Sequence, residues 1–94
     1  MEQKPFELPI DGVLDLHCFN PREVKDLLPH YLTVCRDNGI LQVRIIHWKG
    51  SGALRRTVHA ILKRLPEVVS FSLAESDAGG WGATITVLRA DSNQ

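Results

Sequence analysis

The chain has few cysteines, no long hydrophobic run and no net charge. Its 94 residues include only Cys18 and Cys35, which do not form a paired C-x-x-C motif, so a structural zinc site is not expected. No run of about 18 apolar residues is present, so no membrane-spanning helix is expected. The first residues lack the basic-then-apolar layout of a signal peptide. We therefore expect one soluble domain in the cytoplasm, with both thiols free.

The zero net charge conceals a strong asymmetry. Six of the eleven basic residues and none of the eleven acidic ones fall within residues 41–65, which leaves five bases against eleven acids in the rest of the chain. The six are Arg44, Lys49, Arg55, Arg56, Lys63 and Arg64. A basic segment of this kind can attract a polyanion, and it can equally be the solvated face of a helix. The charge pattern alone does not decide between these interpretations.

The hydrophobic pattern predicts four strands and two helices in the order β-α-β-α-β-β. Strands are expected over 13–17, 42–47, 69–73 and 83–88, and helices from the capping Asn20 to Asn38 and from about Ala53 to Pro66. Strand-helix-strand units favour parallel pairing, whereas the last two strands suit an antiparallel pair. We predict a mixed four-stranded sheet with two helices on one face. Residues 1–12 are expected to be an extended lead-in and 90–94 a frayed tail.

The first two predicted strands each end in a histidine. If these strands are parallel, Asp15, His17 and His47 all approach the C-terminal edge of the sheet, where ligands of open α/β sheets tend to bind. His17 and His47 could act as general base and acid in phosphodiester cleavage, or they could hold a divalent metal together with Asp15. Asp15 could orient an imidazole or serve as a structural acceptor for loop N–H groups. His30 and His59 are expected to face solvent on the helices, without a catalytic role.

The segment after His47 is suited to binding a phosphate. Lys49 and the N–H groups of Gly50 and Gly52 precede the second helix, and Arg55 and Arg56 lie in the first turn of that helix. The alternative is an ordinary strand-to-helix turn, since a G-x-G pattern is common and the P-loop spacing is absent. Trp48, in the same segment, could stack on an unpaired base.

These residues together resemble the Smr (small MutS-related) domain family. Residues 14–17 (Leu-Asp-Leu-His) resemble its first motif, and residues 46–52 (Ile-His-Trp-Lys-Gly-Ser-Gly) resemble its second. Residues 54–55 (Leu-Arg) and 80–84 (Gly-Trp-Gly-Ala-Thr) are similar to its later signatures. The four signatures occur in the family's order and extend from about Leu14 to Leu88, which is nearly the whole chain.

The resemblance implies a two-layer α/β sandwich like the C-terminal domain of a bacterial translation initiation factor. It also implies nucleic-acid binding, often with DNA-nicking or RNA-cleaving activity. The positions that it implicates are Asp15, His17, His47, Lys49, Gly50, Gly52 and Arg55. The family domain often lies at the C-terminus of larger proteins, whereas here we expect a stand-alone domain.

Two residues depart from the family pattern. The family usually has glycine after each motif histidine, and this chain has Cys18 and Trp48 there. If either backbone needs a positive φ, a β-carbon is costly and the loop must differ. Trp48 then either blocks a groove or provides a stacking platform.

We therefore predict an Smr-like nucleic-acid-binding domain with endonuclease activity. Its candidate catalytic residues are Asp15, His17 and His47, and its candidate binding residues are Arg44, Trp48, Lys49, Gly50, Gly52, Arg55 and Arg56. The alternatives are a non-catalytic nucleic-acid-binding module and a protein-interaction module. The sequence does not determine the choice of DNA or RNA, the oligomeric state or the metal, for which Mg²⁺ and Mn²⁺ are the candidates.

Overall fold

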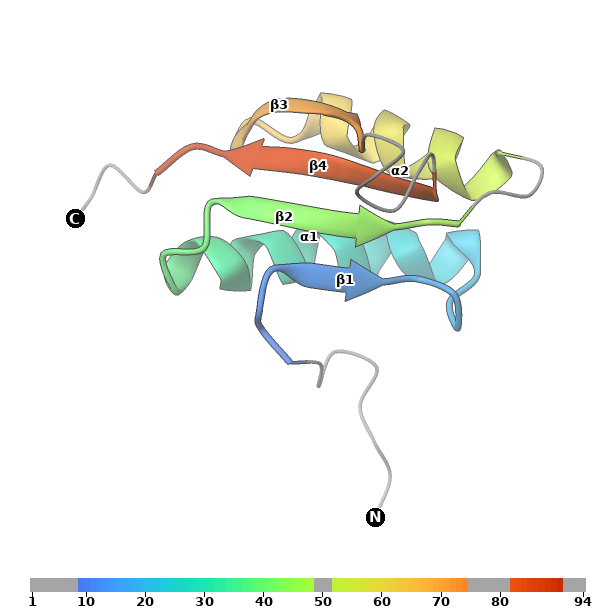
Figure 1. Cartoon of the computed structure of the whole chain (residues 1–94), viewed down its shortest axis with the longest axis horizontal. Coiled ribbons are helices and arrows are strands. Elements are labelled where there is room, and N and C mark those ends of the chain that lie inside the picture. Colours follow the sequence, from blue (N-terminus) through green and yellow to red (C-terminus); the bar gives the residue numbers. More distant parts are fainter. Residues whose placement is uncertain (1–8, 49–51, 75–81, 91–94) are drawn as a thin grey trace, which may run out of the picture.

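The predicted element order is confirmed in a computed structural model that describes residues 9–48, 52–74 and 82–90. The elements are β1 (Val13–Asp15), α1 (Pro21–Asp37), β2 (Gln42–Ile46), α2 (Ala53–Arg64), β3 (Val68–Leu73) and β4 (Ala83–Leu88). They form an α+β fold in which both helices cover the same face of a four-stranded sheet (Figure 1). The other face of the sheet, which we call the open face, has no helix over it among the described residues. Within those residues, no helix combines the length and apolar composition needed to cross a membrane.

The sheet is mixed, as the strand pattern predicts. Its strand order is β1-β2-β4-β3, with β1 and β2 parallel and with β4 antiparallel to both β2 and β3. In this register Asp15 lies beside Ile46, and Ile46 lies beside Ala83. The C-terminal ends of β1 and β2 therefore meet the beginning of β4 at one edge of the sheet.

The first helix begins where its capping residues require. The Asn20 side chain accepts a hydrogen bond from the Glu23 backbone N–H, and the Glu23 side chain accepts one from the Asn20 N–H, each at 2.9 Å. This capping box satisfies two N–H groups that a helix start would otherwise leave unpaired. Pro21, in the first turn, has no N–H to satisfy. The capping box therefore defines where α1 begins after β1.

A single hydrophobic core lies between the helices and the sheet. It contains the apolar faces of α1 and α2 together with the inward residues of the first, second and fourth strands. The buried residues of α1 are Val24, Leu27, Leu28, Tyr31, Leu32 and Cys35. Cys18 is exposed and Cys35 buried, and both are free thiols.

Strand β3 differs from the simple alternation that its sequence suggests. Residues 69–73 alternate with period two, which predicts that Val69, Phe71 and Leu73 share the inward face. Instead Val68 and Phe71 pack against the core, while Val69 and Leu73 are 55% and 40% exposed. The register shifts between Val68 and Ser70. A bulge inserts one extra residue, so core-facing residues on its two sides are three positions apart instead of two.

Candidate functional site

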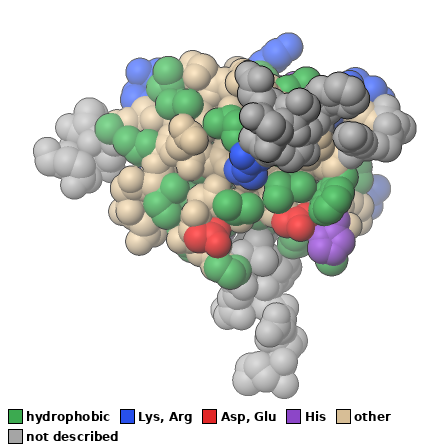
Figure 2. Space-filling model, viewed as in Figure 1, with side chains coloured by type: hydrophobic (Ala, Val, Ile, Leu, Met, Phe, Trp, Pro, Cys, Tyr) green, Lys and Arg blue, Asp and Glu red, His purple; other side chains and the backbone are tan. Residues whose placement is uncertain are grey.

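Strand register determines which face of the sheet each predicted site residue occupies. Because Asp15 pairs with Ile46, His47 continues the row of Leu16, and Trp48 continues the row of His17. Side chains alternate between faces along a strand, so Asp15, His17 and Trp48 are exposed while Leu16 and His47 are buried. The structure thus brings Asp15, His17 and Trp48 together and places His47 in a different environment. Figure 2 shows a histidine beside an acidic side chain among hydrophobic ones at this end of the open face.

Asp15 fixes the orientation of His17. Its Oδ1 accepts hydrogen bonds from the His17 backbone N–H at 3.0 Å and from His17 Nδ1 at 3.1 Å. Burial raises the pKa of Asp15, but the hydrogen bonds from Trp48 and His17 and the charge of His17 outweigh that effect and leave the pKa below its ordinary value. A carboxylate can only accept, so Nδ1 carries the proton and Nε2 of neutral His17 presents its lone pair. The two side chains are 61% and 41% exposed for His17 and Asp15, respectively.

The thiol of Cys18 lies against that free nitrogen. Its Sγ is 3.2 Å from His17 Nε2, the atom that a general base would use. With Nδ1 protonated, Nε2 accepts the weak hydrogen bond that the S–H group can donate. Any substrate group that approaches Nε2 of His17 must displace this thiol, which belongs to an exposed residue.

Trp48 contacts both Asp15 and His17, and its backbone is strained. Its indole Nε1–H donates to Asp15 Oδ1 at 2.9 Å, and its ring makes an edge contact with the His17 ring, with 6.2 Å between centroids. It is the one non-glycine residue with positive φ, 63°, in the described part of the chain. This is a conformation that glycine adopts without the cost of a β-carbon, whereas the backbone of Cys18 has no positive φ. We refer to Asp15, His17 and Trp48 as the exposed cluster.

His47 is nearly inaccessible and its ring nitrogens both have partners. It is 2% exposed, with Nε2 2.8 Å from Thr84 Oγ1 and Nδ1 3.4 Å from the Trp48 carbonyl oxygen. Burial lowers the pKa of His47, the bond to the Trp48 carbonyl raises it by less, and the Arg55 guanidinium lowers it further. The ring is therefore neutral at pH 7. Its buried position separates it from solvent and from the exposed face of His17.

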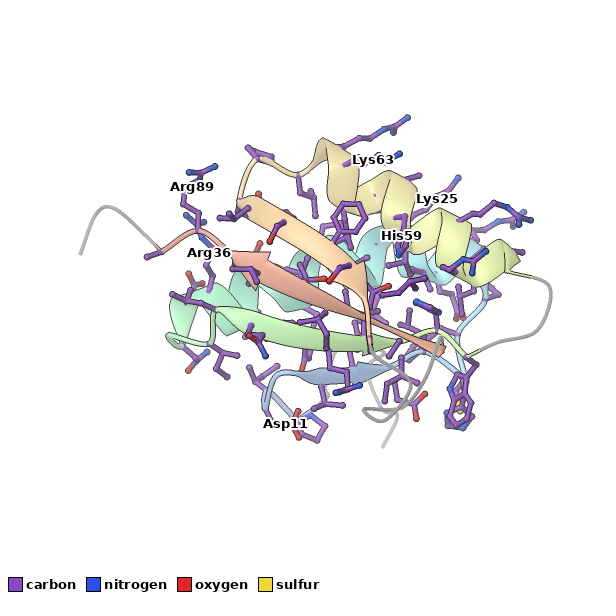
Figure 3. The ribbon with its side chains drawn as sticks, turned by 45° about the horizontal axis from the view of Figure 1, so that its top comes forward. Asp11, Lys25, Arg36, His59, Lys63 and Arg89 are labelled. Carbon is purple, nitrogen blue, oxygen red and sulfur yellow. The ribbon has the colours of Figure 1, made fainter. Side chains whose placement is uncertain are left out.

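His59 does not face solvent freely, which corrects the expectation from the sequence. It is half-buried on the side of α2 that faces the sheet, with Nε2 2.8 Å from Thr84 Oγ1 (Figure 3). Its ring lies 4.9 Å from that of Phe71 and 6.0 Å from that of His47, between centroids. The only sequence signal was its place beside Val58, which belongs to the buried stripe of α2. Nothing in the sequence indicated that Thr84 would bring the two histidines together.

The beginning of α2 carries two guanidinium groups close to the backbone. A β-carbon built on Gly52 would lie 3.1 Å from Nη2 of Arg55 and 3.3 Å from Nη1 of Arg56. Gly52 has a φ of 86°, and the first turn of α2 contains no acidic residue. The guanidinium groups and the positive end of the helix dipole therefore reinforce one another, which favours an anion at this point. Lys49 and Gly50 lie outside the described residues.

Arg44 occupies a different part of the molecule. It lies in the middle of β2, beside Val13 of β1 and Ile85 of β4. Arg44 comes two residues before Ile46, the last residue of β2, so it lies away from the strand ends where the exposed cluster is located. Among residues 9–48, 52–74 and 82–90, no group of three or more His, Cys, Asp or Glu side chains is arranged to hold a metal ion.

The histidine environments predict how folding stability depends on pH. Burial lowers the pKa of His47, and burial together with the charges of His47, Arg55 and Lys63 lowers that of His59. The unfolded chain then binds more protons than the folded chain as the pH falls below 6.5, the ordinary value. The free energy of unfolding should decrease through that range and level off once the pH lies below both folded-state values.

Thermal denaturation followed by circular dichroism between about pH 8 and about pH 5 measures this dependence. The His59→Gln variant, which cannot titrate at that position, should show a smaller decrease in Tm than the parent protein. His30→Gln, on the exposed face of α1, is the matched control and should keep the parental decrease. A decrease that is identical in all three proteins would contradict the assignment.

Comparison with known proteins finds similar sequences over most of the chain. The family model described as "Smr domain" matches residues 14–89. The chain is 37% identical to Endonuclease MutS2 of Halothermothrix orenii over 81 residues, which are 86% of this chain and 10% of that protein. It is 43% identical to Endonuclease MutS2 of Helicobacter pylori over 75 residues, again 10% of that protein. The chain thus spans about a tenth of the length of these relatives.

Two solved structures have the same fold. The Smr domain of Thermus thermophilus MutS2 superimposes with a TM-score of 0.79 at 33% sequence identity, covering 84% of this chain and 99% of that one. YdaL, a stand-alone small MutS-related protein from Escherichia coli, gives a TM-score of 0.77 at 25% identity and covers 83% of this chain and 64% of that one.

Proposed function

The chain belongs to the Smr domain family, and we propose that it binds nucleic acid and cleaves the phosphodiester backbone at the exposed cluster. The observation that carries this proposal is the exposed imidazole of His17, which Asp15 orients at 3.1 Å with Nε2 left as the proton acceptor. The exposed indole of Trp48 lies beside it. The full-length relatives are named endonucleases, which supports the same reaction class.

The chemistry assigned to the cluster is general acid–base catalysis. His17 Nε2 removes a proton from the attacking hydroxyl group or water, and Asp15 stabilises the imidazolium that forms. His47 has no accessible nitrogen and holds the adjacent backbone instead. We therefore replace the acid–base pair of His17 and His47, suggested by the sequence, with a single exposed base. A divalent ion, if the reaction uses one, would supply Lewis-acid stabilisation of the phosphate.

The phosphate backbone is assigned to the strand-to-helix connection and to the open face. Arg55 and Arg56 contribute guanidinium groups at the beginning of α2, next to Gly52. Lys49 and Gly50, which connect β2 to this helix, are included from the sequence. Arg44 would contact the phosphate backbone of the nucleic acid where the nucleic acid crosses β2. Cation–phosphate contacts of this kind supply most of the sequence-independent affinity for nucleic acid.

A charge-reversal experiment tests the binding assignment. Arg55→Glu/Arg56→Glu should weaken binding to a fluorescent oligonucleotide and make the slope of log affinity against log salt shallower by about 1 to 2. Lys63→Glu/Arg64→Glu reverses the same amount of charge at the other end of α2 and serves as the matched control. Equal losses in both variants would show that only net charge matters, and absence of binding at low salt would contradict the proposal.

The cleavage assignment is tested on supercoiled plasmid and on labelled single-stranded RNA. Each substrate is incubated with Mg²⁺, with Mn²⁺ and with a chelator, because neither the nucleic acid nor the ion is specified by the residues present. Cleavage that copurifies with the protein and is lost in His17→Ala supports the nuclease assignment. The substrate that is cut identifies DNA or RNA as the target.

One observation favours a binding module without catalysis. The Sγ atom of Cys18 lies 3.2 Å from His17 Nε2. The family usually has glycine in place of Cys18. If this contact persists in the complex, His17 cannot accept a proton. Salt-sensitive binding without cleavage of either substrate would support this second function. The two free thiols fit a reducing compartment, and we accordingly propose that the protein acts in the cytoplasm.

A further inference from the structure

A buried hydroxyl group joins two histidines that belong to different elements. Thr84, on β4, has no exposed surface, and its Oγ1 lies 2.8 Å from Nε2 of His47 and 2.8 Å from Nε2 of His59. A threonine hydroxyl donates one proton and can accept others. It cannot donate to both rings at once. One ring must therefore donate to Thr84, and the other must accept from it.

The Trp48 carbonyl determines the direction of these hydrogen bonds. His47 Nδ1 lies 3.4 Å from this oxygen, which can only accept. If His47 donated from Nε2 to Thr84, its unprotonated Nδ1 would face the oxygen and neither atom would supply a proton. If His47 is protonated at Nδ1, it donates to the carbonyl and its Nε2 accepts from Thr84. Only the second arrangement places one proton in each of the three contacts.

We propose that His59 is a positioning residue that stabilises, through Thr84, the His47 tautomer favoured by the Trp48 carbonyl. His59 Nε2–H donates to Thr84, the Thr84 hydroxyl donates to His47 Nε2, and His47 Nδ1–H donates to the Trp48 carbonyl. Arg55 and Lys63 on α2 are the cations near the His59 ring, and Phe71 packs on it from β3. These neighbours favour a neutral ring with a single N–H, as the chain of hydrogen bonds requires.

The chain of hydrogen bonds ends at the strained residue of the exposed cluster. Trp48 holds a φ of 63°, a conformation that is unfavourable for a residue with a β-carbon. The His47 bond to its carbonyl and the 2.7 Å bond from its N–H to the Gly82 carbonyl hold that conformation. From there the indole reaches Asp15, which orients His17. His59 would thus act on His17 without touching the substrate, a step that depends on the function proposed above.

Nuclear magnetic resonance can read the tautomers directly. Long-range correlations between ring protons and ring nitrogens in ¹⁵N-labelled protein distinguish protonated from unprotonated nitrogens. At pH 7.5 the parent protein should show His47 protonated at Nδ1 and His59 protonated at Nε2. Observation of His47 protonated at Nε2 would overturn the proposal by itself, without any variant.

Two substitutions at one position separate positioning from packing. In His59→Phe the ring remains but the donor is lost, so Thr84 becomes free to accept from His47, and the Nε2–H tautomer of His47 should become populated beside the Nδ1–H tautomer that the Trp48 carbonyl still favours. His59→Gln supplies an amide N–H donor and should restore the Nδ1–H tautomer. Cleavage should fall about 2- to 10-fold in the Phe variant, as expected for one neutral hydrogen bond, and recover in the Gln variant. A His47 ring that stays entirely in the Nδ1–H form in His59→Phe would overturn the proposal.

The tautomer measurement needs no nucleic acid, so the two proposals can fail separately. The predicted tautomers in a protein that neither binds nor cleaves nucleic acid would leave the positioning role of His59 intact and remove the proposed function. Cleavage by a protein in which His47 is protonated at Nε2 would do the reverse.

Discussion

Replacing His17 with alanine should lower the rate of phosphodiester cleavage by about 10²- to 10⁴-fold while nucleic-acid binding is retained. This is the range that removal of a positioned general base produces. His17 is held by a carboxylate, at 3.1 Å, and its side chain is mostly exposed. Single-turnover cleavage, measured with the protein in excess, separates this loss from any change in affinity.

Three further variants sharpen the assignment. Asp15→Asn should also reduce cleavage. An amide has no negative charge to stabilise the imidazolium, and it can turn its NH₂ donor toward Nδ1, which needs an acceptor. His30→Ala removes an exposed histidine from α1 and should leave cleavage unchanged. Cys18→Ala keeps the contact between Asp15 and His17 but removes the thiol from Nε2, so its cleavage should equal or exceed that of the parent. Full activity in His17→Ala would contradict the mechanism.

Replacing Trp48 with alanine should weaken binding to single-stranded nucleic acid by roughly 5- to 150-fold, with a smaller effect on duplexes. This range corresponds to about 1–3 kcal/mol for one base stacked on an aromatic ring. The indole is 53% exposed and stands at the end of the open face next to His17. Duplex DNA keeps its bases stacked on one another, so it gains little from such a platform.

Two more substitutions separate the roles of Trp48. Trp48→Phe retains an aromatic face but has no N–H for Asp15, so affinity should stay near that of the parent while cleavage decreases. Trp48→Gly should bind as weakly as Trp48→Ala but unfold at a higher temperature, because glycine adopts a φ of 63° without the cost of a β-carbon. Equal affinities in the Ala and Phe variants would show that no base stacks on this residue.

The fold could be predicted from the sequence because the local signals agree with one another. The Asn20 cap, the apolar spacing of α1 and the alternating residues of β4 each indicate the element that the structure contains. Strand β3 shows the limit of that approach. Its bulge changes which residues face the core, and no residue type between Val68 and Ser70 marks the register shift.

The site was predicted less completely, for a reason that lies in strand register. The sequence places Asp15 and His17 on one face, since they are two residues apart, and the structure agrees. The sequence does not show whether His47 lies on the same face of the sheet as Asp15 and His17, because that depends on the pairing of Asp15 with Ile46. The same holds for His59, whose contact with Thr84 joins elements 25 residues apart.

The most direct test is a titration of ¹⁵N-labelled protein with a single-stranded oligonucleotide, followed by nuclear magnetic resonance. The account predicts that the largest shifts occur at the Trp48 indole N–H, at the backbones of Asp15 and His17, and from Gly52 to Arg56. The surface between α1 and α2, which includes Lys25, Pro29 and Arg64, should change little. Shifts confined to that helical surface, or no shifts at low salt, would contradict the assignment of the nucleic-acid site.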